Sequence, residues 1–279
     1  MSVRILRKER INAVTVRMVL DAPRAAAGAK AGQFVILRID ECGERIPLTV
    51  AAADVARGEV TIIFQEVGRS TKRLASLGTG DALADLLGPL GKAAHFGRVG
   101  SVVFVAGGVG IAEALPVARY AKEAGNSVTA VIGARTKDLL ILEDEMRKTV
   151  DRCFAVTDDG SSGVKGLVTQ PLKDLLDQGR YDLAYCVGPD IMMKAVCDLT
   201  RQRGLKTLVS LDANMLDATG MCATCRVTVG GEVKFTCVDG PEFDGHALDW
   251  DEFLKRQKRF VQEEEASLDH YEHACRMTT

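Results

Sequence analysis

The feature that most constrains this chain of 279 residues is a set of three cysteines near its end. Cys222, Cys225 and Cys237 follow Asp217 with the spacing D-x4-C-x2-C-x11-C. A [2Fe–2S] loop carries its ligands as C-x4-C-x2-C…C, and here an aspartate stands at the first position. Because a carboxylate can also ligate iron, four anionic ligands remain available. The spacing therefore predicts a [2Fe–2S] cluster, and with it a protein that handles single electrons.

Other chemistry is open to the same cysteines. A C-x2-C pair also occurs in zinc knuckles, but the nearest histidine, His246, has no paired spacing. A structural or redox-active dithiol needs no metal, and Asp217 in a glycine-containing loop can be a turn former alone. Gly220 favours the cluster, because glycine lets the backbone approach an inorganic sulfide.

The amino-acid composition narrows the classes of protein to which the chain can belong. The chain is 47% hydrophobic and 5% aromatic with a net charge of −2, which is typical of a soluble α/β or α+β protein. It has no basic stripe, so nucleic acid is not an expected partner. No apolar run spans a membrane and no signal peptide is expected at the start. The other cysteines are scattered, which predicts reduced, mostly buried thiols in a cytoplasmic protein: Cys42, Cys153, Cys186, Cys197 and Cys275.

The apolar pattern predicts an all-β unit followed by an α/β unit and a small module. Residues 1–97 carry short β-branched runs between turn signals, typical of an antiparallel barrel. Residues 98–211 alternate buried strands with helices, which predicts a doubly wound parallel sheet. Residues 212–279 are expected to hold the cluster, a hairpin around Gly230-Gly231 and one terminal helix over about 250–265. The strands expected in the sheet cover residues 101–106, 128–132, 153–157, 183–187 and 207–211.

A glycine-rich turn separates the first strand of the expected sheet from an Ala-rich helix. Gly107, Gly108 and Gly110 would let the backbone approach a pyrophosphate, and the helix start would supply unpaired N–H groups. Glycines in such a turn can equally serve close packing of strand and helix. The turn therefore predicts a dinucleotide site, with a packing role as the alternative.

Three other strand ends can contribute to that site. Gly188 and Pro189 follow one strand, and such turns line the ligand crevice of a parallel sheet. Arg135 follows another strand and can reach a ribose or phosphate, or lie free on the surface. Asp159 follows a third and can hold nucleotide hydroxyls or form a solvated turn. NADH and NADPH are not distinguished, because arginine attracts a 2′-phosphate and aspartate repels it.

A barrel ahead of a nucleotide-binding unit suggests a flavin. Arg45 offers a fixed cation for a phosphate. Gly68, Ser70 and Thr71 lie where a strand gives way to a predicted helix, and they offer a close approach, hydroxyls and helix-start amides. Serine and threonine are also ordinary helix caps, so the pattern permits a flavin without requiring one.

Five motifs occur in an order that resembles the ferredoxin–NADP reductase superfamily. They are R-x-P-L-T at 45–49, G-R-S-T at 68–71, L-G-P-L-G at 87–91, G-G-V-G-I-A at 107–112 and G-P-x-x-M-M at 188–193. With Asp217 and the segments 133–146 and 233–246, the chain is most similar to the small subunits of NADH-dependent reduced ferredoxin:NADP oxidoreductase, the sulfide dehydrogenase type. The electron-transfer subunits of dihydroorotate dehydrogenase B are the near alternative.

The resemblance implies a redox relay without acid–base catalytic residues. Hydride would pass from NAD(H) to FAD, and single electrons would pass through [2Fe–2S] to a larger subunit with FAD and [4Fe–4S] clusters, similar to the glutamate synthase small subunit, in an electron-bifurcating complex. The implied FAD site consists of Arg45, Pro47, Leu48, Thr49, Gly68, Ser70 and Thr71. The implied dinucleotide site consists of Gly107, Gly108, Gly110, Gly188 and Pro189. The implied cluster ligands are Asp217, Cys222, Cys225 and Cys237.

The chain departs from the superfamily pattern at three places. Val187 stands where many members have a cysteine before the glycine at the nicotinamide end, so Cys186 is given no role in hydride transfer. Asp217 replaces the first cysteine of the dihydroorotate-type subunits. Glu113 takes the place of a proline after the glycine turn, where little effect is expected. Two other classes stay open, namely an assembly subunit that has lost catalysis and a zinc-stapled binding module.

Overall fold

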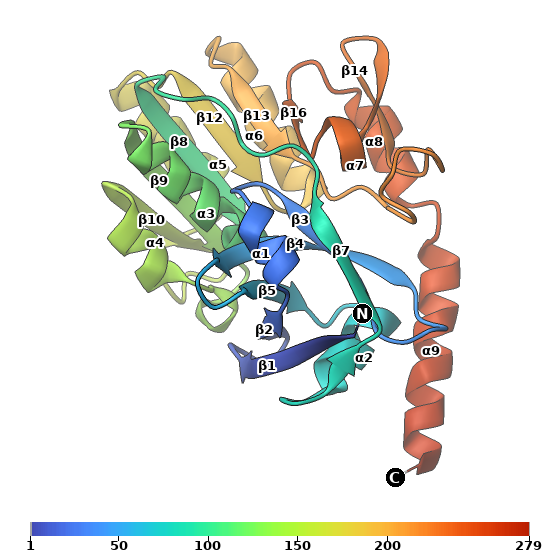
Figure 1. Ribbon diagram of the computed structural model, residues 1–279. Helices are drawn as coiled ribbons and strands as arrows, with labels where there is room; N and C mark the ends of the chain where they lie inside the picture. The colour runs from blue at the N-terminus through green and yellow to red at the C-terminus, as the bar shows by residue number, and fades with distance from the viewer. Residues whose placement is uncertain (1, 279) are drawn as a thin grey trace.

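The structure, a computed structural model, describes residues 2–278, with side chains described up to residue 273. The chain forms an antiparallel barrel, a parallel sheet covered by helices on both faces, and a small C-terminal module (Figure 1). No helix among the described residues is long and apolar enough to cross a membrane. The predicted all-β plus α/β architecture is confirmed. Cys275 lies outside the described side chains.

Seven antiparallel strands form the nearly closed barrel, in the order β6-β1-β2-β5-β4-β3-β7. Their inward side chains, among them Ile5, Met18, Val35 and Ile62, form one apolar core that Leu74 of α2 also enters. The strands are β1 (Val3–Arg10), β2 (Thr15–Asp21), β3 (Phe34–Arg38), β4 (Arg45–Asp54), β5 (Glu59–Gln65), β6 (Ala82–Leu83) and β7 (Asp85–Leu90). The barrel helices are α1 (Pro23–Gly28) and α2 (Arg69–Ser76).

The second sheet has the order β11-β10-β9-β8-β12-β13-β16, and its first six strands are parallel. The strands are β8 (Ser101–Gly107), β9 (Ser127–Ala134), β10 (Arg152–Thr157), β11 (Val164–Lys165), β12 (Leu183–Val187), β13 (Thr207–Ser210) and β16 (Glu242–Asp244). The chain order reverses between β8 and β12, which is the switch point where ligands of such sheets bind. The five strands expected from the sequence are all present.

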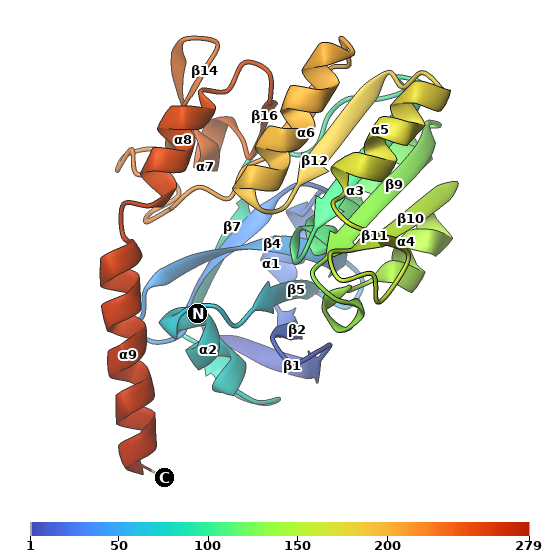
Figure 2. The same cartoon turned by 180° about the vertical axis from the view of Figure 1, so that it is seen from behind.

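Alternate residues of the strands face opposite helix layers, because side chains of a strand alternate with period two. Phe104 packs with α3 (Gly110–Glu123) and α4 (Glu143–Thr149) on one face. Val103 and Val105 pack with α5 (Thr169–Gln178) and α6 (Asp190–Gln202) on the other (Figure 2). A short 3₁₀ helix, η1 (Lys137–Leu139), precedes α4.

The C-terminal module is joined to the parallel sheet, because β16 adds to β13 in antiparallel register. Its hairpin, β14 (Arg226–Val229) and β15 (Glu232–Phe235), turns at Gly230-Gly231 as predicted. It also contains α7 (Thr236–Asp239) and α8 (Trp250–Gln257), and Asp249 caps α8 by accepting from the Glu252 N–H at 2.9 Å. Its buried residues share one core with Phe34 and Ile36 of the barrel.

The prediction of one terminal helix over about 250–265 is wrong. The chain forms α8 and a second helix, α9 (Val261–Thr278), which leaves the module and runs along the barrel (Figure 1). Trp250 and Phe253 anchor α8 in the core, whereas Val261 is 39% exposed. With no apolar surface to follow beyond α8, the helix is interrupted, and α9 instead contacts α2 through a Lys72–Glu272 ion pair.

Two cysteine predictions also need correction. Cys186 and Cys197 are buried as expected, but Cys42 is exposed and Cys153 is half-buried. Cys42 lies in the turn between β3 and β4, where its N–H donates to Asp40 Oδ1 at 3.0 Å. A thiol in such a turn has no core to enter, because the turn extends into solvent.

Candidate functional site

The first half of β4 is paired on one side only. Pro47, Leu48 and Thr49 pair with β3, while pairing with β5 begins at Val50. Pro47 fits this arrangement, since proline has no N–H to offer a second strand. Arg45 is exposed at the start of the strand. The segment expected to hold the flavin therefore presents an open backbone edge beside an exposed cation.

The 68–71 segment lies close to the start of β4. Ser70 donates a hydrogen bond to the carboxylate of Glu44, next to Arg45. A Cβ placed on Gly68 would meet no atom within 4 Å, so its backbone is open to a bound group. Thr71 Oγ1 accepts from the N–H groups of Val67 and Gly68 at 3.1 Å each, which makes it a local cap of α2. The segment therefore fits a bound phosphate, and Thr71 contributes by holding the backbone of the turn in place.

The glycine turns after β8 and β12 lie against each other. A Cβ on Gly110 would meet the Val187 carbonyl oxygen at 2.8 Å, and one on Gly188 would meet Gly107 N at 2.9 Å. A Cβ on Gly107 would meet Met192 Sδ at 2.6 Å, so all three of these glycines have a packing reason of their own. Gly108 differs, because its φ is +57° and a Cβ there would meet nothing within 4 Å. It is the glycine of this turn that leaves room for a ligand.

Arg135 follows β9 and Asp159 follows β10, at the same carboxyl edge of the parallel sheet as the glycine turns. Arg135 is exposed, and its carbonyl accepts from the Asp159 N–H at 3.3 Å. Asp159 accepts from the Ser161 N–H at 2.9 Å and hydroxyl at 2.6 Å, and these hydrogen bonds lower the pKa of its carboxyl. The turn-forming alternative for Asp159 is thus realised in the structure, and its role toward a nucleotide stays a prediction, as does that of exposed Pro189.

The barrel and the parallel sheet meet at a hydrogen bond that the sequence did not predict. Thr49 Oγ1 donates to Glu113 Oε2 at 3.2 Å, joining β4 to the start of α3. Burial is the main cause that raises the pKa of Glu113 to about 7. Across the sheet, Tyr185 donates to Glu242 Oε1 at 2.9 Å, and burial raises the pKa of Glu242 to about 7 as well.

We refer to Thr49, Glu113, Tyr185, Ser210 and Glu242 as the junction. Its members come from β4, α3, β12, β13 and β16. Sequence reasoning missed the last four of them. The one signal was an acidic residue inside an otherwise apolar helix start, and such a residue usually only complements the helix dipole.

The cluster segment holds its four expected ligands as two pairs. Cys222 Sγ donates to Asp217 Oδ1 at 3.3 Å, and the sulfurs of Cys225 and Cys237 lie 3.3 Å apart. That second distance is too long for a disulfide bond of about 2.05 Å. Within residues 2–273, no group of three ligand-type side chains converges on a point for a single metal ion.

The loop that carries these pairs has the backbone expected around a cluster. Ala218, Gly220 and Ala223 all have positive φ, of 59°, 82° and 54°. Alanines adopt this region only under constraint from their surroundings. The Gly220 N–H is hydrogen-bonded to the thiol of Cys237 and acts to lower its pKa, although burial raises the net pKa to about 12. Because a [2Fe–2S] cluster has two irons, each of which takes two protein ligands, two separate ligand pairs fit it, and Asp217, Cys222, Cys225 and Cys237 would hold it.

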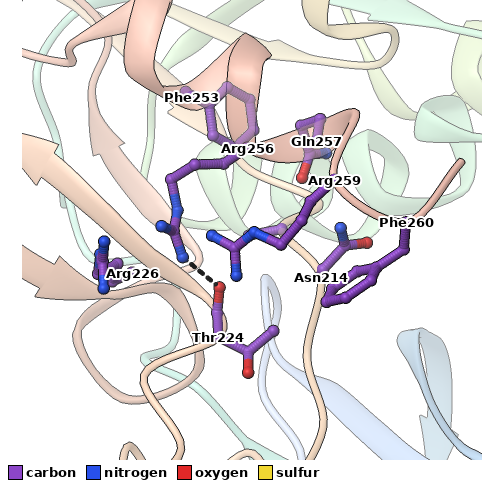
Figure 3. Close-up of a pocket in the computed structure, with 9 residues that line it drawn as sticks. Asn214, Thr224, Arg226, Phe253, Arg256, Gln257, Arg259 and Phe260 are labelled. Atoms are coloured by element: carbon purple, nitrogen blue, oxygen red, sulfur yellow. Dashed lines mark hydrogen bonds between the residues drawn. The ribbon is translucent and has the colours of Figure 1, made fainter.

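Three arginines surround a small cavity between this loop and α8 (Figure 3). Arg256 donates to the Thr224 carbonyl at 2.9 Å, and Thr224 lies between Cys222 and Cys225. Burial and the neighbouring charges of Arg259 and Arg226 lower the pKa of Arg256. Cations at this place would compensate the negative charge of a cluster if the four predicted anionic ligands held one.

Comparisons with known proteins agree with this geometry. Residues 104–198 match the oxidoreductase NAD-binding domain, and residues 212–249 match the iron-sulfur cluster binding domain of dihydroorotate dehydrogenase B. A solved chain of the NADH-dependent reduced ferredoxin-NADP oxidoreductase superposes with a TM-score of 0.91 at 42% identity, covering 96% of this chain and 97% of that one. A ferredoxin NADP⁺ reductase from Neisseria gonorrhoeae with bound FAD and NADP shares the fold, with a TM-score of 0.61 at 19% identity, over 77% of this chain and 94% of that one.

Two curated relatives cover almost the whole chain. A Clostridium beijerinckii protein, known as an uncharacterized protein in the adh 3′ region, is 47% identical over 270 residues, which is 94% of this chain and 91% of its own length. A Thermotoga maritima homolog of the dihydroorotate dehydrogenase B (NAD(+)) electron transfer subunit is 44% identical over 267 residues, 96% and 94% of the two chains.

The fold and the site define an NAD-binding oxidoreductase with an iron–sulfur domain. The chain belongs to the family of dihydroorotate dehydrogenase B electron transfer subunits and their homologues. Proteins of this architecture use FAD, a [2Fe–2S] cluster and NAD(H), as the sequence motifs predicted.

Proposed function

We propose that this protein is the electron-transfer subunit of a cytoplasmic complex of the NADH-dependent ferredoxin:NADP type. When bound, FAD accepts a hydride from NAD(H) and the [2Fe–2S] cluster takes electrons singly, for delivery to a larger flavoprotein subunit with [4Fe–4S] clusters. Support comes from the TM-score of 0.91 with the solved NADH-dependent reduced ferredoxin-NADP oxidoreductase chain.

The observation that carries the proposal is a pair of hydrogen bonds between the three predicted units. Thr49 of the predicted flavin segment bonds Glu113, beside the predicted dinucleotide turn, at 3.2 Å. Glu242, from the module that carries the cysteines, bonds Tyr185 in the sheet at 2.9 Å. A relay needs its cofactors close together, and these contacts support such an arrangement.

Each site has its own role in this proposal. The open edge of β4, with Arg45 and the Gly68 turn, would hold FAD. Gly108 and the start of α3 would hold the pyrophosphate of the dinucleotide, and the packed glycines would keep β8 and β12 close enough to form the crevice. Asp217, Cys222, Cys225 and Cys237 would hold [2Fe–2S]. We also propose that the chain divides into units at residues 97 and 211.

The test is anaerobic purification of the chain with reconstitution, followed by optical and paramagnetic resonance spectra. We expect a flavin and a [2Fe–2S] signal that NADH reduces, with NADPH less effective. A protein that binds zinc and no iron, or that shows neither the flavin nor the [2Fe–2S] absorption after reconstitution, would end the proposal.

A second function is favoured by the other relatives. The protein of that family from Desulforamulus reducens, named dihydroorotate dehydrogenase B (NAD(+)), electron transfer subunit, is 32% identical over 248 residues. The native partner separates the two functions. A co-purifying subunit that oxidises dihydroorotate would support this alternative, and a larger subunit with [4Fe–4S] clusters would support the first.

A further inference from the structure

The Glu113 carboxyl occupies an unusual place for an acid. Its Oε2 accepts from Thr49 at 3.2 Å, while its Oε1 is sealed from solvent and has no hydrogen-bond partner among the described residues. A buried carboxyl oxygen without a partner carries a free-energy cost. The cost falls if that oxygen takes up a proton or bonds a bound group.

The groups that face Glu113 leave it without a cation. Burial is the largest influence on its pKa, the nearby Ser210 at the end of β13 acts to lower that pKa, and the charge of Asp212 acts to raise it. The charge of Glu113 in turn raises the pKa values of Glu242 and Tyr185. The hydrogen bond from Thr49 and the proximity of Ser210 favour the ionised form, but burial outweighs them and the pKa is about 7. Both protonation states are therefore accessible near neutral pH.

The proposed relay creates a need for such a group. A hydride brings two electrons and one proton to the flavin site. The electrons leave one at a time for the cluster and the partner, and the proton stays behind. Turnover requires a base that accepts this proton and later returns it to solvent. Candidates must lie beside the flavin segment, and Thr49 lies in that segment.

We propose that Glu113 is the proton acceptor of the flavin site, acting through the Thr49 hydroxyl. The proposal rests on the proposed function, because it takes the R-x-P-L-T segment as the flavin site. In the step itself the Thr49 hydroxyl gives its proton to Glu113 as it receives the one released from the flavin. The electrons leave to the cluster, so charge and atoms balance.

The experiment compares the flavin-loaded wild type with Glu113→Gln, which keeps the size and the hydrogen bond from Thr49 but cannot ionise. The flavin midpoint potential is followed from pH 5.5 to 9. In the wild type we expect the pH dependence to change slope near pH 7, and in the variant this change should vanish. Glu123→Gln, at the exposed far end of α3, is the matched control and should behave as wild type.

A kinetic readout accompanies the potential. Reoxidation of the reduced flavin by ferricyanide, a one-electron acceptor, should slow about a hundredfold in Glu113→Gln at pH 7.5. Thr49→Val should slow it similarly while keeping the change of slope, since the acid remains. If Glu113→Gln fails to retain flavin, Glu113→Asp replaces it and should shift the slope change to another pH.

Two failures can be told apart. Flavin-loaded Glu113→Gln with unchanged slope and rate would overturn the proton role and leave the proposed function intact. A wild-type protein that takes up no flavin would overturn both.

Discussion

The cluster segment and the junction are built in opposite ways. All four expected cluster ligands lie within the short segment from Asp217 to Cys237, three on one loop and Cys237 in α7 just past the β14–β15 hairpin. The junction draws Thr49, Glu113 and Glu242 from strands and a helix far apart in the sequence. The difference teaches that a metal-binding loop can be recognised from spacing, whereas a buried polar contact between domains cannot. It also predicts that mutations act locally in the first region and on domain packing in the second.

The largest effect is expected from removing a buried cluster ligand. Cys225→Ser replaces a thiolate that is buried beside Cys237 with a hydroxyl, which is a poor ligand for iron. We expect the loss of nearly all [2Fe–2S] signal with flavin content retained, measured by iron analysis and paramagnetic resonance. Cys42→Ser, in an exposed turn, should keep full iron content. Loss of flavin together with iron would show that a mutation in the cluster segment also disturbs the flavin site, against the local effect that we expect.

Gly110→Ala tests the packing of the junction side. The new Cβ would meet the Val187 carbonyl oxygen at 2.8 Å, which forces the start of α3 away from the end of β12. We expect a loss of unfolding free energy of about 1–3 kcal/mol and weaker NADH binding, with cluster content unchanged. The control is Gly179→Ala, where a Cβ meets nothing within 4 Å. Equal stability of the two variants would contradict the packing role.

The junction carboxyls predict a pH dependence of stability. The folded-state pKa values of Glu113 and Glu242 are raised to about 7 from 4.5, so the native state binds more protons than the unfolded state between these values. Their contribution is complete below about pH 4.5 and is lost as the pH rises through 7. We expect each carboxyl to contribute a loss of about 2 kcal/mol of unfolding free energy between pH 5.5 and 8 in the cofactor-free protein, or about 4 kcal/mol for the two. Glu242→Gln should reduce this dependence by about half in urea titrations, and a stability that rises over this range would contradict it.

Arg256→Ala probes the link between α8 and the cluster loop. The change removes the hydrogen bond to the Thr224 carbonyl, which is 2.9 Å long, and one of three neighbouring cations. We expect a destabilisation of about 1 kcal/mol and a lower midpoint potential of the cluster, since a cation stabilises the reduced form. Lys255→Ala, exposed on the same helix, is the control. An unchanged potential would limit Arg256 to a structural role.

Asp217→Cys should have the smallest effect on the amount of [2Fe–2S] cluster that the protein holds. Four anionic ligands remain, so the [2Fe–2S] signal should persist while its potential moves, as redox titration would show. A potential equal to that of the wild type would remove Asp217 from the ligands of the cluster.

The sequence by itself determined the elements whose signals are local. Buried strands such as Leu183–Val187, the Gly230-Gly231 hairpin and the Asp217–Cys237 spacing follow from periodicity, turn chemistry and ligand geometry, each readable within a few residues. Only the tertiary structure decided the rest. It split the terminal helix where apolar support ends, gave Gly107, Gly110 and Gly188 a packing role, and set Glu113 against Thr49. These outcomes depend on burial and on contacts between distant segments, and the free energy of a buried group is fixed by neighbours that the local sequence does not contain.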